Sequence, residues 1–489
     1  MNLLRILFHK LLPQGGFIRN VSILAGGTTL SQGIILLATP LITRLYTPDD
    51  LGILGVFTSF LTIILVVSSL RYEIAIPLPT KIHDAFNLLV IAILINVGIS
   101  ILIIPFTVFF ARPIAEFISV PEIASWLYLL PIGILFAGLY KALYYWNIRK
   151  SKFGTLSKTK FIQSFSMVGM QLAAFKLASL GLIIGQIIGR TAGFSTMGKD
   201  LWKSDKYLFS HVNWKNLRRM AKRYVKLPMY STWNGLFNTA GMQLPPVFFA
   251  ALFSPAAAGI YTLTNRVLTL PINLISNAVA DVFFSTASES YREGNLKTTV
   301  IRVYGLLTEI ILPPAIVLLL TGPELFSFVF GKEWTDAGIL VQWFIPWMVL
   351  AFITSPLTRL FSILERESMG ALFQVILLTV RIIFIIVTYI ITHDFILTAS
   401  LFAIVGAIVL VFILWWCFAA SHIRIRLGIC IFLKKLPYAL ILASPTILVH
   451  FGKMLTDNIK IVHVFIGAIV SSIIIAINYI RISRKNNFR

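Results

Sequence analysis

Long apolar stretches separated by short polar breaks run through the whole chain. Each has about 20 residues or more, the length that an α-helix needs to cross roughly 30 Å of hydrocarbon. Stretches such as residues 395–420 are apolar on every face, whereas the strands of a membrane barrel alternate over about ten residues. The pattern predicts about fourteen transmembrane helices, at 20–46, 51–78, 84–110, 123–148, 154–177, 179–200, 224–252, 256–286, 298–321, 334–363, 367–392, 395–421, 434–452 and 459–481.

A sequence repeat relates the two halves of the chain. Residues 45–53 (LYTPDDLGI) match residues 252–260 (LFSPAAAGI), and each copy joins the first helix of a six-helix group to its second. In both copies Thr or Ser can cap the second helix, and Pro occupies its first position. Because an even number of crossings separates the copies, the two groups should run parallel, related by an axis along the membrane normal.

We therefore expect an all-α polytopic membrane protein with two parallel six-helix lobes. The predicted parts are an interfacial N-terminal helix (1–19), an N-lobe (20–200), a basic cytoplasmic loop (201–223), a C-lobe (224–421) and two appended helices (434–481). The N-terminal segment is amphipathic, and its apolar run is too short for a signal peptide.

Composition excludes a soluble domain. Hydrophobic residues make up 57% of the 489 positions and charged residues only 12%, and the mean hydropathy is +0.87. The net charge of +23 does not indicate nucleic-acid binding, because the basic residues punctuate apolar runs and form no single patch. The two cysteines, Cys417 and Cys430, and seven scattered histidines predict no disulfide framework, no metal site and no cofactor.

The distribution of Lys and Arg predicts the orientation in the membrane. With the N-terminus inside, the inner loops carry about 34 basic residues and the outer loops about six. Positively charged loops stay cytoplasmic, so both termini of this multi-pass protein should be cytoplasmic.

Polar side chains inside the predicted helices recur at helical spacing. Arg381 belongs to a series spaced by sevens in the eleventh helix. One stripe in the eighth helix, within about 80° on a regular α-helix, consists of Arg266, Asn273, Asn277 and Asp281. Charges in hydrocarbon cost at least about 2.5 kcal/mol each, so such residues should face a wet cavity or a partner.

These residues suggest a cationic lumen that binds an anionic substrate. The candidate substrate-binding residues are Arg71, Lys141, Lys160, Arg266, Arg381, Asn273 and Asn277. Asp281 and Glu309 are candidates for ion coupling, since Glu309 precedes Pro313-Pro314, where a broken helix would leave carbonyls exposed to a cation.

Structural alternatives stand beside each of these roles. Asn, Gln, Ser and Thr can simply join helices by hydrogen bonds, and the two acids can neutralise nearby arginines. Lys141 and Lys160 can snorkel to the interface. Four aromatic residues suit an aromatic belt better than a platform for stacking sugars: Tyr140, Tyr144, Tyr145 and Trp146.

No catalytic pattern is present. The sequence has no P-loop, no HExxH and no GxSxG elbow, so neither an ATPase nor a standard hydrolase is expected. The outer loops are also short, which argues against a membrane polymerase or glycosyltransferase of polysaccharide synthesis. We expect a transporter and not an enzyme.

The pattern resembles the polysaccharide flippases of the O-antigen (Wzx) type, in the multidrug and oligosaccharidyl-lipid exporter superfamily. The resemblance rests on Gly26-Gly27, Gln32, residues 40–52 (PLITRLYTPDDLG) and residues 70–77 (LRYEIAIP), together with the basic mid-chain loop and the two-lobe repeat. It implies alternating-access transfer of a polyprenol-diphosphate-linked oligosaccharide from the inner to the outer leaflet of a bacterial inner membrane. The implied partners are that lipid, membrane lipids and a polysaccharide polymerase and chain-length regulator of lipopolysaccharide, capsule or exopolysaccharide biosynthesis.

Two relatives are alternatives. Multidrug exporters of the superfamily commonly carry a carboxylate in the first or seventh helix, and residues 20–46 and 224–252 contain none. Lipid II flippases carry arginines inside the first helix, whereas here Arg19 precedes the predicted helix and Arg44 lies at its outer end, in the turn toward the next helix. Both readings therefore rank below the polysaccharide flippase.

Overall fold

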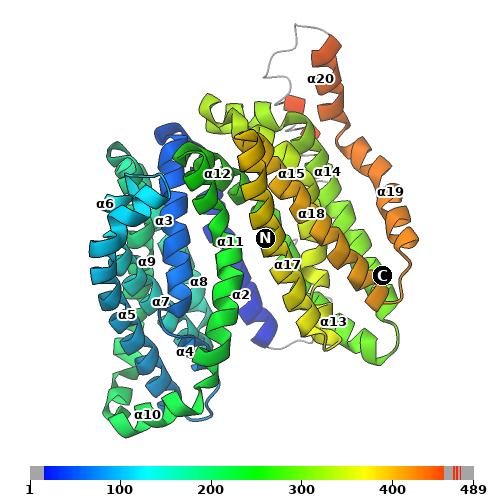
Figure 1. Ribbon diagram of the computed structural model, residues 1–489. Coiled ribbons are helices and arrows are strands. Elements are labelled where there is room, and N and C mark those ends of the chain that lie inside the picture. The colour runs from blue at the N-terminus through cyan, green and yellow to red at the C-terminus, as the bar shows by residue number, and fades with distance from the viewer. Residues whose placement is uncertain (1–15, 456–465, 468–469, 472–473, 475–489) are drawn as a thin grey trace. The chain divides into compact units, whose positions relative to one another are not determined.

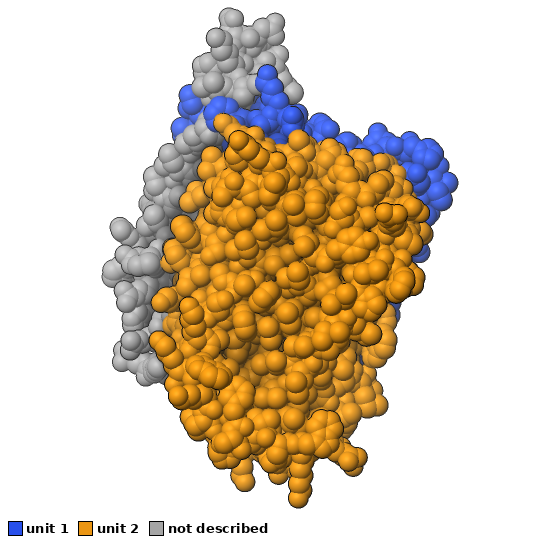
Figure 2. Space-filling model, turned by 90° about the vertical axis from the view of Figure 1, so that its left-hand side faces the viewer, with its two compact units in different colours: residues 1–12, 263–489 blue, residues 13–262 orange. Residues whose placement is uncertain are grey.

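The computed structural model describes residues 16–455, 466–467, 470–471 and 474, and this part of the chain is entirely helical apart from turns. It leaves the side chains of residues 16–25, 234, 278, 281 and 451–455 undescribed. Residues 13–262 form one compact unit, here called the N-unit, and the described residues from 263 onward form a second, the C-unit (Figure 2). Each unit is considered by itself.

Ten α-helices and the beginning of an eleventh make up most of the described N-unit, with short 3₁₀ or π helices at Phe175–Leu177, Lys206–His211 and Leu227–Ser231 (Figure 1). They are α2 (Gly16–Leu45), α3 (Pro48–Val67), α4 (Tyr72–Ala75), α5 (Ile82–Phe117), α6 (Ile123–Leu127), α7 (Leu130–Arg149), α8 (Phe153–Ala173), α9 (Ser179–Asp205), α10 (Trp214–Arg223), α11 (Thr232–Leu252) and the start of α12 (Pro255–Pro271). Close packing joins α2 to α8, α8 to α9, and α3 to α11.

The described C-unit continues from α12 through a π-helical turn at Ile272–Ser276. Its remaining helices are α13 (Asn277–Arg292), α14 (Leu296–Phe330), α15 (Thr335–Leu357), α16 (Leu360–Ile363), α17 (Glu367–Thr392), α18 (Phe395–Ala420), α19 (Ile425–Leu442) and α20 (Ser444–Leu455). The pairs α14–α15, α15–α18 and α17–α18 pack closely, and α19 packs along α14.

Every predicted membrane segment up to residue 452 falls on one helix or on consecutive helices, and the segment at 459–481 lies mostly outside the described residues. Six helical stretches of the described chain are long and apolar enough to cross a membrane. The bent pair α19–α20 would make a seventh. The protein is thus an all-helical polytopic membrane protein, while a count of fourteen crossings stays a prediction.

Two predicted segment boundaries change. Residues 16–19, expected in an interfacial helix, are the first residues of α2, and residues 1–15 of that segment lie outside the described part. The expected basic loop at 201–223 is instead mostly helical, because α9 continues to Asp205 and α10 begins at Trp214. Asn213 caps α10 by accepting a hydrogen bond from the Asn216 backbone N–H at 2.8 Å.

The repeated motif forms the helix caps that its sequence predicts. Thr47 and Asp50 make a reciprocal capping box at the start of α3, with Pro48 in the first turn. In the second copy the Ser254 hydroxyl accepts from the Ala257 N–H at 3.1 Å, at the start of α12. Local sequence alone therefore determines where both helices begin.

The two copies also contact each other within the N-unit. A methyl group on Gly52 would lie 1.8 Å from the Pro255 carbonyl oxygen, and one on Gly259 would lie 1.8 Å from the Pro48 carbonyl oxygen. Each glycine thus packs against the proline carbonyl of the other copy. The crossing of α3 and α12 is reciprocal, and it requires a residue without a Cβ at both positions.

Candidate functional site

Arg71 lies in a strained turn between α3 and α4. Leu70 and Arg71 both adopt the left-handed conformation, with φ of 47° and 63°, which is unfavourable for residues with a Cβ. The turn brings the Arg71 guanidinium against α11, where a methyl group on Gly235 would lie 1.7 Å from Nη2. The buried Nε of Arg71 has no hydrogen-bond partner.

Glu73 is fully buried two residues further on, with 0% exposure. Its carboxylate accepts a hydrogen bond from the Ser69 hydroxyl at 2.6 Å and pairs with Lys141 Nζ at 2.7 Å. Lys141 comes from α7, so the pair joins two elements of the N-unit. The structure therefore places the predicted lumen cation Lys141 beside a carboxylate that neutralises its charge.

Lys160 of α8 contacts α2 and α7. Its ammonium donates to the Thr28 hydroxyl at 2.8 Å and lies 5.9 Å from the centre of the Tyr144 ring. One turn away, the hydroxyls of Ser31 and Ser164 are hydrogen-bonded to each other. Here the polar residues of the first and fifth predicted helices join the two helices directly.

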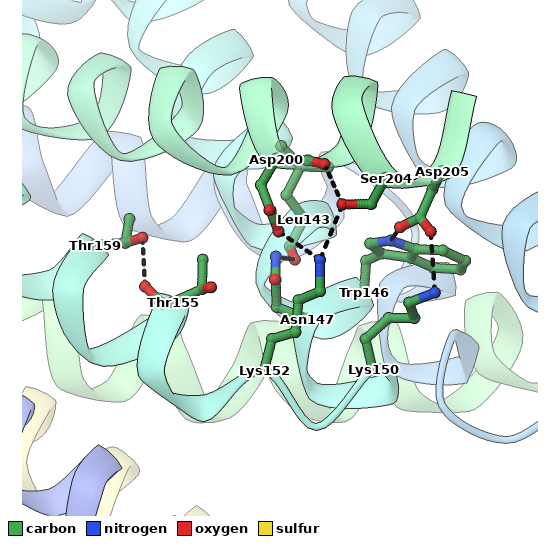
Figure 3. A network of polar contacts seen from close by, with 10 residues as sticks. All are labelled: Leu143, Trp146, Asn147, Lys150, Lys152, Thr155, Thr159, Asp200, Ser204 and Asp205. Carbon is green, nitrogen blue, oxygen red and sulfur yellow. Dashed lines mark hydrogen bonds and ion pairs between the residues drawn. The ribbon is translucent and has the colours of Figure 1, made fainter. Parts of the chain in front are cut away.

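An aromatic belt is excluded for two of the α7 aromatic residues. Tyr140 is 7% exposed and Trp146 is 2% exposed, so neither reaches a membrane interface. The Trp146 indole N–H donates to Asp205 at 2.9 Å, and Lys150 pairs with the other oxygen of that carboxylate (Figure 3). The end of α7 is thus tied to the end of α9.

Sequence reasoning missed Arg190. This residue lies in the middle of α9, in the apolar run 179–200, and interacts electrostatically with Tyr140 of α7. A lone arginine so far from both ends of a predicted span is the same signal that identified Arg266. The structure brings Arg190, Tyr140, Tyr144 and Lys160 into one contiguous series, since the two tyrosine rings lie 6.2 Å apart.

In the C-unit, the predicted stripe on the eighth helix is interrupted. Arg266 belongs to α12, whereas Asn273 lies in the π-helical turn and Asn277 begins α13; both asparagines are exposed. The prediction assumed 3.6 residues per turn throughout, but a π turn is wider and rotates the residues after it. The side chain of Asp281 lies outside the described part.

Arg381 of α17 packs against two neighbouring helices. Its guanidinium lies 4.5 Å from the centre of the Phe402 ring and 5.5 Å from that of Trp347. Gly406 of α18 leaves the space that the guanidinium occupies, since a methyl group there would lie 2.3 Å from Nη2. Arg381 thus contacts aromatic faces of α15 and α18, an arrangement that favours a planar cation.

Glu309 pairs with Lys435 of α19 at 2.5 Å. The expected helix break at Pro313-Pro314 is wrong, because α14 continues through both prolines to Phe330. The helix is thus not interrupted beside Glu309. The described residues also contain no group of three or more His, Cys, Asp or Glu that could hold a metal ion.

Comparison with known proteins decides the family. The model of a family described as "Polysaccharide biosynthesis protein" matches residues 41–338, more than half of the chain. The chain belongs to this family. It is also similar to the teichuronic acid biosynthesis protein TuaB of Bacillus subtilis (strain 168), with 23% identity over 227 residues. That match spans 46% of this chain and 46% of TuaB, about half of each.

Solved structures show the fold of this family member. The lipid II flippase MurJ in an inward closed conformation is similar with a TM-score of 0.68 at 16% identity, over 94% of this chain and 99% of that one. An inward-facing multidrug resistance MATE family transporter of the MOP superfamily is similar with a TM-score of 0.64 at 12% identity, over 80% and 94% of the two chains. This chain therefore has the fold that these two solved structures share. The family match confirms the resemblance to polysaccharide biosynthesis proteins that the sequence indicated.

Proposed function

We propose that this protein is a flippase for polyprenol-diphosphate-linked oligosaccharide repeat units. It would move them by alternating access from the inner to the outer leaflet of a bacterial cytoplasmic membrane, for synthesis of O-antigen, capsule or exopolysaccharide. The family, the similarity to a teichuronic acid biosynthesis protein and the transporter fold support this function. A polysaccharide polymerase and a chain-length regulator would act with it.

For the arrangement of the helices in the membrane, we propose the topology that the sequence predicts. About fourteen helices would cross the membrane, the N-lobe (20–200) and the C-lobe (224–421) running parallel and the last two helices (434–481) being an appendage. Both termini would be cytoplasmic.

The observation that carries the proposal is that each unit holds one intrahelical arginine for which the described residues supply no acidic partner. Arg190 in α9 and Arg266 in α12 are part of no ion pair among the described residues. A guanidinium stays charged at any physiological pH, so inside a transmembrane helix it needs water or an anion. A diphosphate supplies two bidentate acceptors of matching geometry.

Lipid II is the alternative cargo that a specific observation favours. Arg19 lies in the first turn of α2 and not before it, so the first helix does carry an arginine near its start. The prediction that separated this chain from lipid II flippases placed Arg19 before the first helix and Arg44 after it, whereas α2 runs from Gly16 to Leu45 and includes both.

Flipping by the purified full chain in proteoliposomes tests the proposal. We expect transfer of a polyprenol-diphosphate oligosaccharide, and a second series with lipid II distinguishes the two cargoes. Arg266→Ala, Arg381→Ala and Arg190→Ala should each abolish transfer, while the Lys variants of the three positions retain part of it. Arg292→Ala, which removes an exposed arginine at the end of α13, is the matched control and should transfer normally.

Wild-type rates in all three Ala variants would exclude diphosphate binding by these arginines. The same vesicles with an imposed pH or sodium gradient test the coupling role of Asp281 and Glu309. If Asp281→Asn and Glu309→Gln respond to the gradient as the wild type does, the two acids are structural, as the Glu309–Lys435 pair favours.

A further inference from the structure

One face of α10 carries five cations. At about 100° per residue these side chains lie within about 140° of one another, opposite the buried Leu217 and Met220. All five are exposed, and we call them the basic face: Lys215, Arg218, Arg219, Lys222 and Arg223.

The helix that presents this face is held firmly against the N-unit. Leu217 and Met220 pack into a hydrophobic core together with Phe86 and other residues of α5. Arg219 pairs with Asp84 at 2.7 Å, and the Tyr72 hydroxyl donates to the Ala221 carbonyl at 3.0 Å. Because its apolar side is already buried, α10 presents its cations outward from a fixed backbone.

The carboxylates near this segment are already paired. Asp200 pairs with Lys152 at 2.7 Å, and Asp205 pairs with Lys150 at 2.9 Å (Figure 3). Within the part of the chain that the structure describes, the other four cations of the basic face have no ion pair. No carboxylate of the described residues therefore neutralises their charge.

Exposed aromatic side chains lie at the start of α10 and in the chain segment just before it. Trp214 at the start of α10 is 77% exposed, Trp202 near the end of α9 is 65% exposed, and Tyr207 is 56% exposed. Trp and Tyr are enriched at the headgroup level of membranes, where one part of the ring is apolar and the other is wet.

Chain connectivity should keep α10 near the bilayer surface, because the segment that follows it, 224–252, is a predicted membrane helix. Leu227, where the helix leading into α11 begins, follows Arg223 by four residues, which span at most about 14 Å when extended. That distance is comparable to the screening length of roughly 8–10 Å in physiological salt, and long Lys and Arg side chains shorten it further.

We propose that the basic face of α10, with Trp214 beside it, binds the anionic phospholipid headgroups of the adjacent leaflet. Basic residues near an anionic membrane surface each strengthen binding about fivefold. The partner is a lipid and not a soluble acidic protein, because α10 lies in the chain between two segments that the sequence predicts to cross the membrane (179–200 and 224–252) and begins with the exposed Trp214. This surface is separate from the proposed cargo site and is tested by binding rather than by flipping.

Quenching of Trp214 fluorescence by brominated lipids measures this binding. The full chain is reconstituted in vesicles that contain phosphatidylcholine and phosphatidylglycerol. In one preparation the phosphatidylglycerol is brominated, and in the other part of the phosphatidylcholine is brominated. The fluorescence of Trp214 is obtained by subtracting the fluorescence of the Trp214→Phe variant from that of the wild type. We expect stronger quenching by brominated phosphatidylglycerol, weakening as salt rises.

Two variants that remove the same number of positive charges test whether the basic face is responsible for the preference for phosphatidylglycerol. The quadruple variant Lys215→Gln, Arg218→Gln, Lys222→Gln and Arg223→Gln should reduce the preference for phosphatidylglycerol at least about tenfold. The control quadruple removes the same charge from exposed positions of the C-unit and should keep that preference: Lys297→Gln, Arg302→Gln, Arg424→Gln and Arg426→Gln.

Three results would overturn the proposal. Equal quenching by the two brominated lipids would show no headgroup preference. An equal loss of the preference for phosphatidylglycerol in both quadruple variants would show that this preference depends only on the net charge of the protein. A loss of surface polysaccharide in cells carrying the α10 variant, with no preference for phosphatidylglycerol in vesicles, would assign the surface to a protein partner instead.

Discussion

At the scale of single residues, the structure separates cations that are neutralised from cations that are not. Lys141 is paired with the buried Glu73, whereas Arg190 and Arg266 are part of no ion pair among the described residues. We expect the two kinds of cation to serve different purposes. A buried pair stabilises the fold only while both members are present, and a lone guanidinium can accept an anionic ligand.

The Glu73–Lys141 pair leads to a stability prediction. Lys141→Met leaves the Glu73 carboxylate buried beside Ser69 alone, so it should lower the free energy of unfolding by about 3–5 kcal/mol. The double variant Glu73→Gln/Lys141→Met removes both charges and should recover most of that loss. Thermal unfolding of the purified protein in detergent compares the variants, and a double variant as unstable as the single one would contradict the assignment.

At the scale of secondary-structure elements, the reciprocal contact of α3 and α12 connects the two copies of the repeat. Gly52 and Gly259 each approach a backbone carbonyl, which cannot move away as a flexible side chain could. Helices α3 and α12 can approach this closely only because both copies of the repeat have glycine at this position. A substitution at either position has to separate the helices.

Gly52→Ala and Gly259→Ala should therefore each strongly reduce polysaccharide export. Their added methyl groups would lie 1.8 Å from carbonyl oxygens, far inside van der Waals contact. Gly33→Ala is the matched control, because nothing lies within 4 Å of a methyl group there. Surface polysaccharide and the amount of protein in the membrane are measured together, and normal export by both crossing variants would show that α3 and α12 can separate without loss of function.

At the scale of the whole molecule, charge determines how the chain should lie in the membrane. The basic residues of α10 and of the turn before α19 belong to the same predicted side, and the short turn Lys332–Trp334 between α14 and α15 belongs to the other.

A topology experiment follows from this charge asymmetry. Reporters fused after Arg489 or inserted near Lys206 should read cytoplasmic, and one inserted near Glu333 should read external. Alkaline phosphatase and green fluorescent protein, which are active on opposite sides of the membrane, give complementary readings. An external reading at either of the first two sites would require an odd change in the number of crossings.

Much of the helical organisation follows from the sequence by itself. Apolar runs predict where the helices lie, since hydrocarbon leaves no other way to satisfy the backbone. The Thr47 and Ser254 caps follow from residues a few positions away, so their geometry needs no tertiary context. The repeat and the all-helical membrane class could also be predicted from the sequence, because both depend on local patterns of residues.

Tertiary structure alone decided which polar groups meet. Lipid-facing and buried positions are both apolar in a membrane protein, so periodicity does not show which face of a helix meets which neighbour. Glu73 forms an ion pair with Lys141 from another helix of the N-unit, and Glu309 forms one with Lys435, which lies far along the chain. The π turn at Ile272–Ser276 likewise changed the eighth helix, because a single wide turn leaves no mark in the spacing of apolar residues.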